Sequence, residues 1–65
     1  MQIYVNGEER HTDATSISSL LVELAMQGRM IAIERNLEVV PKSTYAEAML
    51  VEGDRIEIVH MIGGG

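Results

Sequence analysis

The sequence predicts an α+β fold in which a mixed β-sheet of four to five strands packs against one main helix. Apolar residues alternate with polar ones near both ends of the chain, as in half-buried strands, and they recur at helical spacing in between. The 65 residues include no cysteine and no linker-like segment, which fits one small domain held together by packing alone. A single helix of this kind covers one face of one sheet.

The N-terminal segment MQIYVNGEER predicts a β-hairpin. Ile3 and Val5 share one face of the first strand, and Asn6 and Gly7 follow them directly. This dipeptide favours a type I′ turn, because both of its central residues require a positive φ. The return strand is expected over residues 8–12, where polar side chains indicate an edge position.

The next segment, TSISSLLVELAMQG, changes to helical spacing. Ser16 is the expected N-cap, with Thr15 as the alternative. Gly28 fits the C′ position that ends a helix. We interpret the apolar face of this helix as core, because a protein of this size has one helix with which to cover its sheet. The face consists of Ile17, Leu20, Leu21 and Leu24, with Ala25 as a further candidate.

The C-terminal half predicts three further strands. RMIAIERN gives the first of them, and LEVVP gives a short one that ends at Pro41. A short helical turn is expected after Pro41. A tight turn at residues 52–54 precedes RIEIVHMI, the strongest strand pattern in the chain.

This order of elements predicts a β-grasp: a hairpin, a crossover helix, and a long apolar strand that pairs in parallel with the first strand in the middle of the sheet. We expect a domain over residues 1–60 and a flexible tail over residues 61–65. The predicted core consists of Ile3, Val5, Ile17, Leu20, Leu21, Leu24, Ile31, Ile33, Leu50, Ile56 and Ile58.

Composition excludes several classes of function. The net charge is −5, and the five Lys and Arg residues are scattered, so the chain lacks the clustered cations that bind nucleic acid. No apolar run reaches membrane-spanning length, and the N-terminus lacks a signal-peptide pattern. We therefore expect a cytoplasmic protein with no nucleic-acid or membrane partner. The acidic surface favours docking onto basic protein surfaces.

The sequence is poorly equipped for catalysis of its own. It has no cysteine, no Gly-rich phosphate loop and no Ser/His/Asp set at a helpful spacing. His11 and His60 lack the additional ligands of a metal site. We interpret the carboxylate pairs Glu8 with Glu9, and Glu52 with Asp54, as solvated charges in turns. The chain is therefore not expected to be an enzyme by itself.

The last three residues hold half of the six glycines in the chain. A frayed terminus is one explanation. The other is chemical, because the α-carboxylate of Gly65 becomes an electrophile once it is activated as an acyl-phosphate or acyl-adenylate. The chain has no nucleotide site, so a partner enzyme must supply the activation. Residues without a Cβ suit passage through a narrow channel.

Five segments together resemble the ThiS family, the small ubiquitin-like sulfur carriers of thiamine thiazole biosynthesis. They are VNGEE, SISSLLVEL, IAIERNLEVVPKS, VEGDRIEIV and the terminal GGG, and they span nearly the whole chain. One departure is Tyr45, where the family pattern has tryptophan. The small subunit of molybdopterin synthase shares the fold and the Gly-Gly end but is usually longer.

The resemblance implies a role for the tail. An E1-like adenylyltransferase of the ThiF type would adenylate Gly65 with ATP, and a persulfide donor protein would supply the sulfur that makes a thiocarboxylate. A thiazole synthase of the ThiG type would then receive that sulfur. Gly64 is the required neighbour, and Gly63 and Ile62 continue the tail that enters the partner active sites. The chain itself would bind no cofactor.

Partner docking is expected on the sheet face opposite the helix, at Val59, Met61 and Tyr4, which alternate out of phase with the core. Three other functions stay open from the sequence alone. The chain could be a carrier like the molybdopterin synthase small subunit, a ubiquitin-like modifier that ends in a bond to lysine, or an interaction module with an idle tail.

Overall fold

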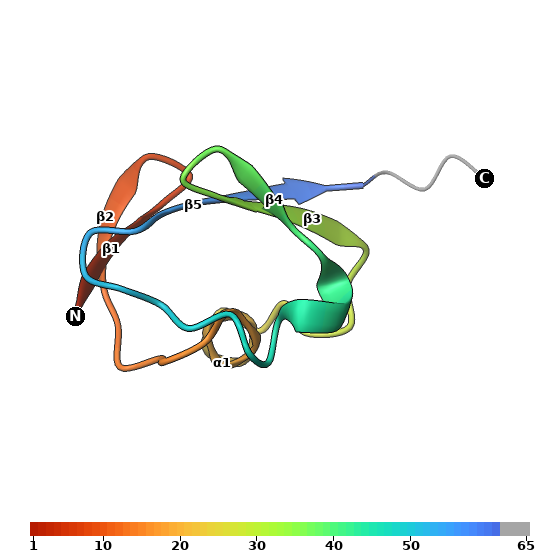
Figure 1. Ribbon diagram of the computed structural model, residues 1–65, viewed down its shortest axis with the longest axis horizontal. Coiled ribbons are helices and arrows are strands. Elements are labelled where there is room, and N and C mark those ends of the chain that lie inside the picture. Colours follow the sequence, from red (N-terminus) through yellow and green to blue (C-terminus); the bar gives the residue numbers. More distant parts are fainter. Residues whose placement is uncertain (62–65) are drawn as a thin grey trace.

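The computed structural model describes residues 1–61 and shows a five-stranded sheet with one α-helix beneath it (Figure 1). The strand order is β2-β1-β5-β3-β4. The elements in chain order are β1 (Gln2–Val5), β2 (Glu8–His11), α1 (Ile17–Glu23), β3 (Ile31–Arg35), β4 (Glu38–Val40), the 3-10 turn η1 (Lys42–Thr44) and β5 (Arg55–His60). The helical turn predicted after Pro41 is therefore confirmed.

The last strand, β5, lies in the middle of the sheet. It pairs in parallel with β1, where Val5 is opposite Ile56, and antiparallel with β3, where Ile33 is opposite Ile58. The two hairpins form the outer parts of the sheet, β1 with β2 on one side and β3 with β4 on the other. This is the predicted β-grasp arrangement.

Both hairpins have two-residue turns with positive φ at each central residue. The first turn has Asn6 at φ 51° and Gly7 at φ 82°, as the sequence predicts. The second has Asn36 at φ 51° and Leu37 at φ 72°. Leucine rarely adopts this left-handed conformation, because its Cβ crowds the backbone.

The two asparagines attach the hairpins to β5. The Asn6 Oδ1 atom accepts a hydrogen bond from the Ile58 N–H at 2.7 Å, and the Asn36 Oδ1 atom accepts one from the Arg55 N–H at 2.9 Å. Each side chain thus satisfies a backbone donor of the central strand. The turn residues therefore help to fix where the two halves of the sheet meet.

Helix α1 begins at a capping box. The Ser16 Oγ atom accepts a hydrogen bond from the Ser19 N–H at 3.1 Å, and the Ser19 Oγ atom accepts one from the Ser16 N–H at 2.9 Å. These two bonds satisfy backbone donors that would otherwise be unpaired at the helix start. The predicted N-cap, Ser16, is confirmed.

The helix ends earlier than predicted. Leu24 is the C-cap, Ala25 takes the left-handed conformation at φ 58°, and the Met26 N–H donates to the Leu21 carbonyl at 2.8 Å. This is a Schellman ending with alanine at C′. The prediction that Gly28 occupies C′ is wrong, and Gly28 uses its φ of 78° in the loop to β3.

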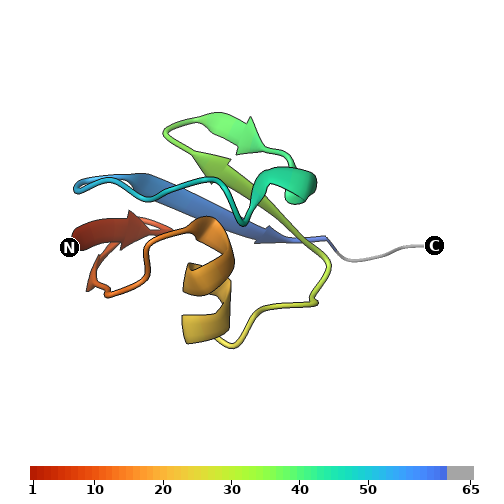
Figure 2. The ribbon, with the colours of Figure 1, turned by 60° about the horizontal axis from the view of Figure 1, so that its bottom comes forward.

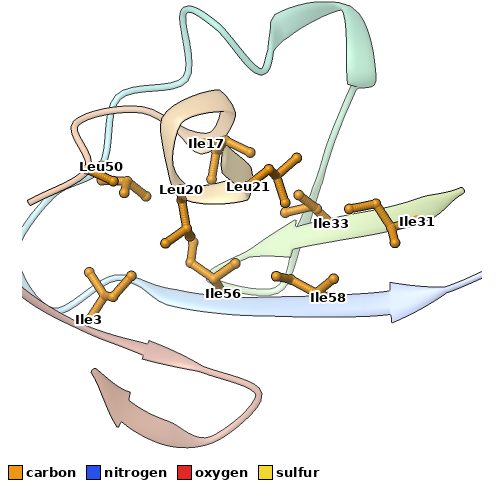
Figure 3. Close-up of a cluster of buried hydrophobic side chains, with 10 residues drawn as sticks. Ile3, Ile17, Leu20, Leu21, Ile31, Ile33, Leu50, Ile56 and Ile58 are labelled. Carbon is orange, nitrogen blue, oxygen red and sulfur yellow. The ribbon is translucent and has the colours of Figure 1, made fainter. Parts of the chain in front are cut away.

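The core fills the space between α1 and one face of the sheet (Figure 3). Nine of the eleven predicted core residues are buried, whereas Val5 and Leu24 are half-buried and pack against the cluster. Ala14 joins the core without having been predicted. The buried apolar residues are Ile3, Ala14, Ile17, Leu20, Leu21, Ile31, Ile33, Leu50, Ile56 and Ile58.

Asp54 is buried, with 5% of its surface exposed, and the interpretation of this carboxylate as a solvated charge is wrong. Its Oδ2 atom accepts a hydrogen bond from the Val51 N–H at 2.8 Å and lies 3.1 Å from the Arg35 Nε atom. Its Oδ1 atom accepts a bond from the Asn36 Nδ2 atom at 3.1 Å. Asp54 therefore joins the turn before β5 to the β3–β4 hairpin. Glu52, by contrast, is exposed, as interpreted.

Candidate functional site

The C-terminal segment leaves the molecule from the end of the central strand. His60, the last residue of β5, is exposed and lies opposite Ile31, the first residue of β3. The Met61 N–H then donates to the Met30 carbonyl at 2.9 Å. The chain is therefore held to the sheet as far as Met61 (Figure 1). We call residues 60–61 the tail root.

The residues with the predicted chemistry follow the tail root. Ile62, Gly63, Gly64 and Gly65 lie outside the described residues. The division into a domain over residues 1–60 and a tail over residues 61–65 also stays a prediction. The structure describes the surface that surrounds the tail root.

The two faces of the sheet differ. Helix α1 and the 3-10 turn η1 both lie on the face that carries the core isoleucines (Figure 1). The strand registers place Tyr4, Val59 and Val39 on the other face, out of phase with Ile3, Ile58 and Val40. No element among residues 1–61 covers this second face, which we call the open face.

Two of the three predicted docking residues lie beside each other. Val59 is 54% exposed and pairs with Ala32, and Met61 is 50% exposed. Met30, which was not among the predicted docking residues, is 64% exposed, and its carbonyl accepts the hydrogen bond from the Met61 N–H. We call Met30, Val59 and Met61 the root patch. Met30 directly precedes the core residue Ile31, and the alternation of a strand would have predicted that Met30 lies on the open face.

Tyr4 lies apart from the root patch. It is half-buried and pairs with Arg55 at the start of β5, and the Arg55 guanidinium carbon is 4.7 Å from the centre of its ring. Val59 is four residues farther along β5, about 13 Å away at the usual rise of a strand. The three predicted docking residues therefore do not form one continuous patch.

The charges on the open face are acidic near the root patch. Glu34 of β3 lies directly opposite Glu57 of β5, and neither makes an ion pair within residues 1–61. Like charges in directly opposed positions repel each other. A partner with basic residues would relieve this repulsion as it docks.

Two ionisable groups elsewhere have shifted pKa values. The Thr12 hydroxyl, which donates to Glu23, lowers the pKa of Glu23 with help from Arg10 and against a smaller effect of burial. Burial raises the pKa of Tyr45. Residues 1–61 hold no group of three potential metal ligands, and none of their helices has the length and apolar character to cross a membrane.

Comparison with known proteins identifies relatives of this arrangement. The model described as the ThiS family matches residues 3–65. The sulfur carrier protein ThiS of Bacillus subtilis (strain 168) is 40% identical over 53 residues, which cover 82% of this chain and 80% of that protein. The crystal structure of the thiamine biosynthesis protein ThiS from Geobacter metallireducens superposes with a TM-score of 0.86 at 28% identity, over 100% of both chains.

A further relative is much longer. The thiazole synthase of Paramagnetospirillum magneticum is 50% identical over 66 residues, which cover 100% of this chain but 20% of that protein. The chain therefore spans about a fifth of the length of the thiazole synthases that it matches. The fold is a ubiquitin-like β-grasp, and the family match extends over all but the first two residues. The chain belongs to the ThiS family.

Proposed function

We propose that this chain is a sulfur carrier of thiamine biosynthesis that bears its sulfur as a thiocarboxylate on Gly65. The supporting observation is the family match over residues 3–65, which includes the terminal glycines. The fold agrees with this function, because the tail root belongs to the central strand and is anchored by a bond from Met61 to Met30. A fixed root gives partner enzymes a defined starting point for the tail.

The chemistry begins with activation by an E1-like adenylyltransferase. A Gly65 carboxylate oxygen attacks the α-phosphorus of ATP, and pyrophosphate leaves. The terminal sulfur of a persulfide donor protein then attacks the carbonyl carbon and displaces AMP, which gives an acyl disulfide. A thiol cleaves the S–S bond, and the thiocarboxylate remains on the carrier. ATP is thus used by the partner, and the carrier acts as a protein substrate rather than as an enzyme.

The tail residues have matching roles in this proposal. Gly64 and Gly63 carry no side chain, so the backbone passes through a narrow channel to the nucleotide, and Ile62 continues the segment that enters it. Correct placement of the reacting carbon is essential, since small displacements cost large factors in rate. The open face with its root patch is the proposed docking surface.

The second partner in the proposal is a thiazole synthase. Proteins named thiazole synthase contain a segment that resembles the whole of this chain. The presence of such a segment within thiazole synthases supports the inference that this carrier delivers its sulfur to an enzyme of that kind. A cytoplasmic location, where ATP is available, is part of the same proposal.

The decisive experiment compares the parent chain with a chain that lacks Gly65. Each is incubated with the E1-like enzyme, ATP, a persulfide donor and a thiol, and intact mass is measured. The parent should exchange one oxygen for sulfur, and the shortened chain should not, because its terminal carbon no longer reaches the nucleotide. Thermal unfolding is the control and should be the same for both, since the core lies within residues 3–58.

Other outcomes point to other functions. A parent chain that never gains sulfur, or a shortened chain that does, contradicts the proposal. Adducts of the chain with lysine side chains would instead identify a modifier. A thiocarboxylate that thiazole synthase cannot use, but molybdopterin synthase can, would identify a different sulfur pathway.

A further inference from the structure

A pocket of about 130 Å³ lies between α1, η1 and the loop that leads into β3. Its apolar lining comes from Leu21, Met26 and Ile31. Its polar lining comes from Ser18, Gln27, Arg29, Lys42 and Tyr45. These five side chains carry hydrogen-bond donors, and no carboxylate lines the pocket.

The cations of the chain explain why this pocket is unusual. Arg10 pairs with Glu23 at 2.9 Å, Arg35 pairs with Asp54 at 3.1 Å, and Arg55 lies over the ring of Tyr4. The remaining two of the five, Arg29 and Lys42, make no ion pair within residues 1–61. Both of them line this one pocket.

Two of the polar side chains that line the pocket have hydroxyls free to form hydrogen bonds with a ligand. The hydroxyls of Ser18 and Tyr45 make no hydrogen bond within residues 1–61, although the Ser18 N–H donates to the Tyr45 carbonyl at 3.0 Å. A lining that combines residues with donors and cations and residues with apolar side chains matches a ligand with an apolar body and a carboxylate. The net charge of the chain is −5, so this is a local exception on an acidic molecule.

The size of the pocket selects between kinds of ligand. Sites for cofactors and drug-sized molecules occupy about 300–1,000 Å³. The volume here is well below that range and suits a single side chain. A protein segment with one apolar side chain next to a carboxylate therefore fits better than a free small molecule.

The location indicates which protein supplies that segment. Ile31 forms one wall of the pocket and pairs with His60 at the tail root. The loop after α1, the turn η1 and the tail root gather at one end of the molecule (Figure 2). An enzyme that takes up the tail must cover this end.

We propose that the pocket receives an apolar side chain flanked by a carboxylate, presented by an enzyme that takes up the tail. Arg29 and Lys42 bind the carboxylate, and Leu21 and Ile31 contact the apolar group. This contact is separate from the open face, which matches basic partner residues. The inference rests on the proposed function, because it assigns a second docking contact to the same partners.

The test uses the double variant Arg29→Gln with Lys42→Gln. Its affinity for the purified E1-like enzyme and for thiazole synthase is measured by calorimetry. Loss of two exposed charge contacts should weaken binding to at least one enzyme about tenfold. The variant Arg29→Lys with Lys42→Arg preserves both charges at these exposed positions and should bind within about threefold of the parent. Neither cation has an ionic partner in the described structure, so the thermal midpoint should be unchanged.

A second control separates the pocket from net charge. Gln2→Glu with Thr15→Glu changes the net charge equally at exposed positions away from the pocket. If this variant loses affinity as much as the glutamine pair, or if the glutamine pair binds both enzymes like the parent, the inference is wrong. A parent chain that gains sulfur in that case leaves the proposed function intact. A parent that neither gains sulfur nor binds either enzyme overturns both.

Discussion

Leu37 occupies the turn position that glycine fills in the first hairpin. Its φ is 72°, and 88% of its surface is exposed. The side chain therefore gains almost no burial in return for a conformation that costs about 1–2 kcal/mol in an L-residue. Asn36 beside it is better suited, because asparagine tolerates the left-handed region and its side chain bonds β5.

We predict that Leu37→Gly stabilises the protein. Relief of the backbone strain exceeds the extra entropy that glycine brings to the unfolded chain, so the free energy of unfolding should rise by about 0.5–1 kcal/mol. Urea unfolding at constant slope would show this as a higher midpoint. The matched control is Gly7→Ala, which should lower the midpoint, because alanine is strained at the φ of 82° that Gly7 adopts. The added Cβ would meet only open space, so the effect would come from the backbone alone. A midpoint for Leu37→Gly at or below that of the parent would show that the strain is not there.

Residue by residue, sequence reasoning succeeded where the local signal was chemical. Asn6 and Gly7 together predict the type of the first turn, and Ser16 predicts the start of the helix; both predictions are confirmed. It failed at Asp54, because burial of a turn carboxylate depends on Arg35 and Asn36, which are far away in the sequence. It also failed at Ala25, since alanine carries no signal for the left-handed conformation.

Helix α1 depends on its neighbours more than on its own propensity. It has seven residues, well below the length at which isolated helices persist in water. A carboxylate near its C-terminus attaches it to the first hairpin, since Glu23 accepts a hydrogen bond from the Thr12 hydroxyl at 2.8 Å and pairs with Arg10 at 2.9 Å. Both partners precede the helix in the chain.

The interactions of Glu23 with Thr12 and Arg10 should make the free energy of unfolding depend on pH. The hydrogen bond from Thr12 lowers the pKa of Glu23 in the folded state, so folding favours the ionised carboxylate. The contribution is fully present above the unfolded pKa, about 4.3, and is lost as the pH falls through the lower folded value. We predict that the thermal midpoint of the parent falls more between pH 7 and pH 3 than that of Glu23→Gln.

The control for this prediction is Glu47→Gln, at an exposed carboxylate that forms no ion pair within residues 1–61. This variant should follow the acid dependence of the parent. Equal losses of midpoint in the parent and in Glu23→Gln would contradict the assigned role of Glu23.

The order and the type of the main elements could be predicted because most have a clear period or a clear stop. The exceptions are β2, which was predicted from the turn at Asn6 and Gly7, and η1, which was predicted from its place after Pro41. The early end of the helix could not, because it is set by tertiary contacts. Met26 packs against the core and closes the Schellman bond to Leu21. The apolar residues Leu24 and Ala25 continue the helical spacing, although the helix ends at Glu23.

The molecule as a whole presents two different sides at the tail end. The open face carries the root patch and the opposed pair Glu34 and Glu57, and the helix side carries the pocket with Arg29 and Lys42. The alternation of apolar residues along β5 predicted the open face at Val59. No local pattern predicted the pocket, because its walls come from three separate segments.

We predict that Val59→Asp weakens binding to the E1-like enzyme about tenfold or more, because it places a charge in the centre of the proposed docking surface. Affinity measured by calorimetry tests this. The matched control is Val22→Asp on the outer side of α1, where valine is 59% exposed compared with 54% at Val59. Both variants should stay folded by circular dichroism. Equal affinities of the two variants for the enzyme would contradict the proposal that the open face is the docking surface.

The central place of β5 also affects how the chain folds during synthesis. Among the strands, β1 pairs only with β2 until β5 is present, and β3 pairs only with β4. Two hairpins of this size are marginal in water when they are separate. The strand that unites them, Arg55–His60, is the last of the described strands to be translated. The stable domain therefore forms only after nearly all of these 65 residues have been translated, so a chain that stops before β5 lacks both the tail and the surface that presents it.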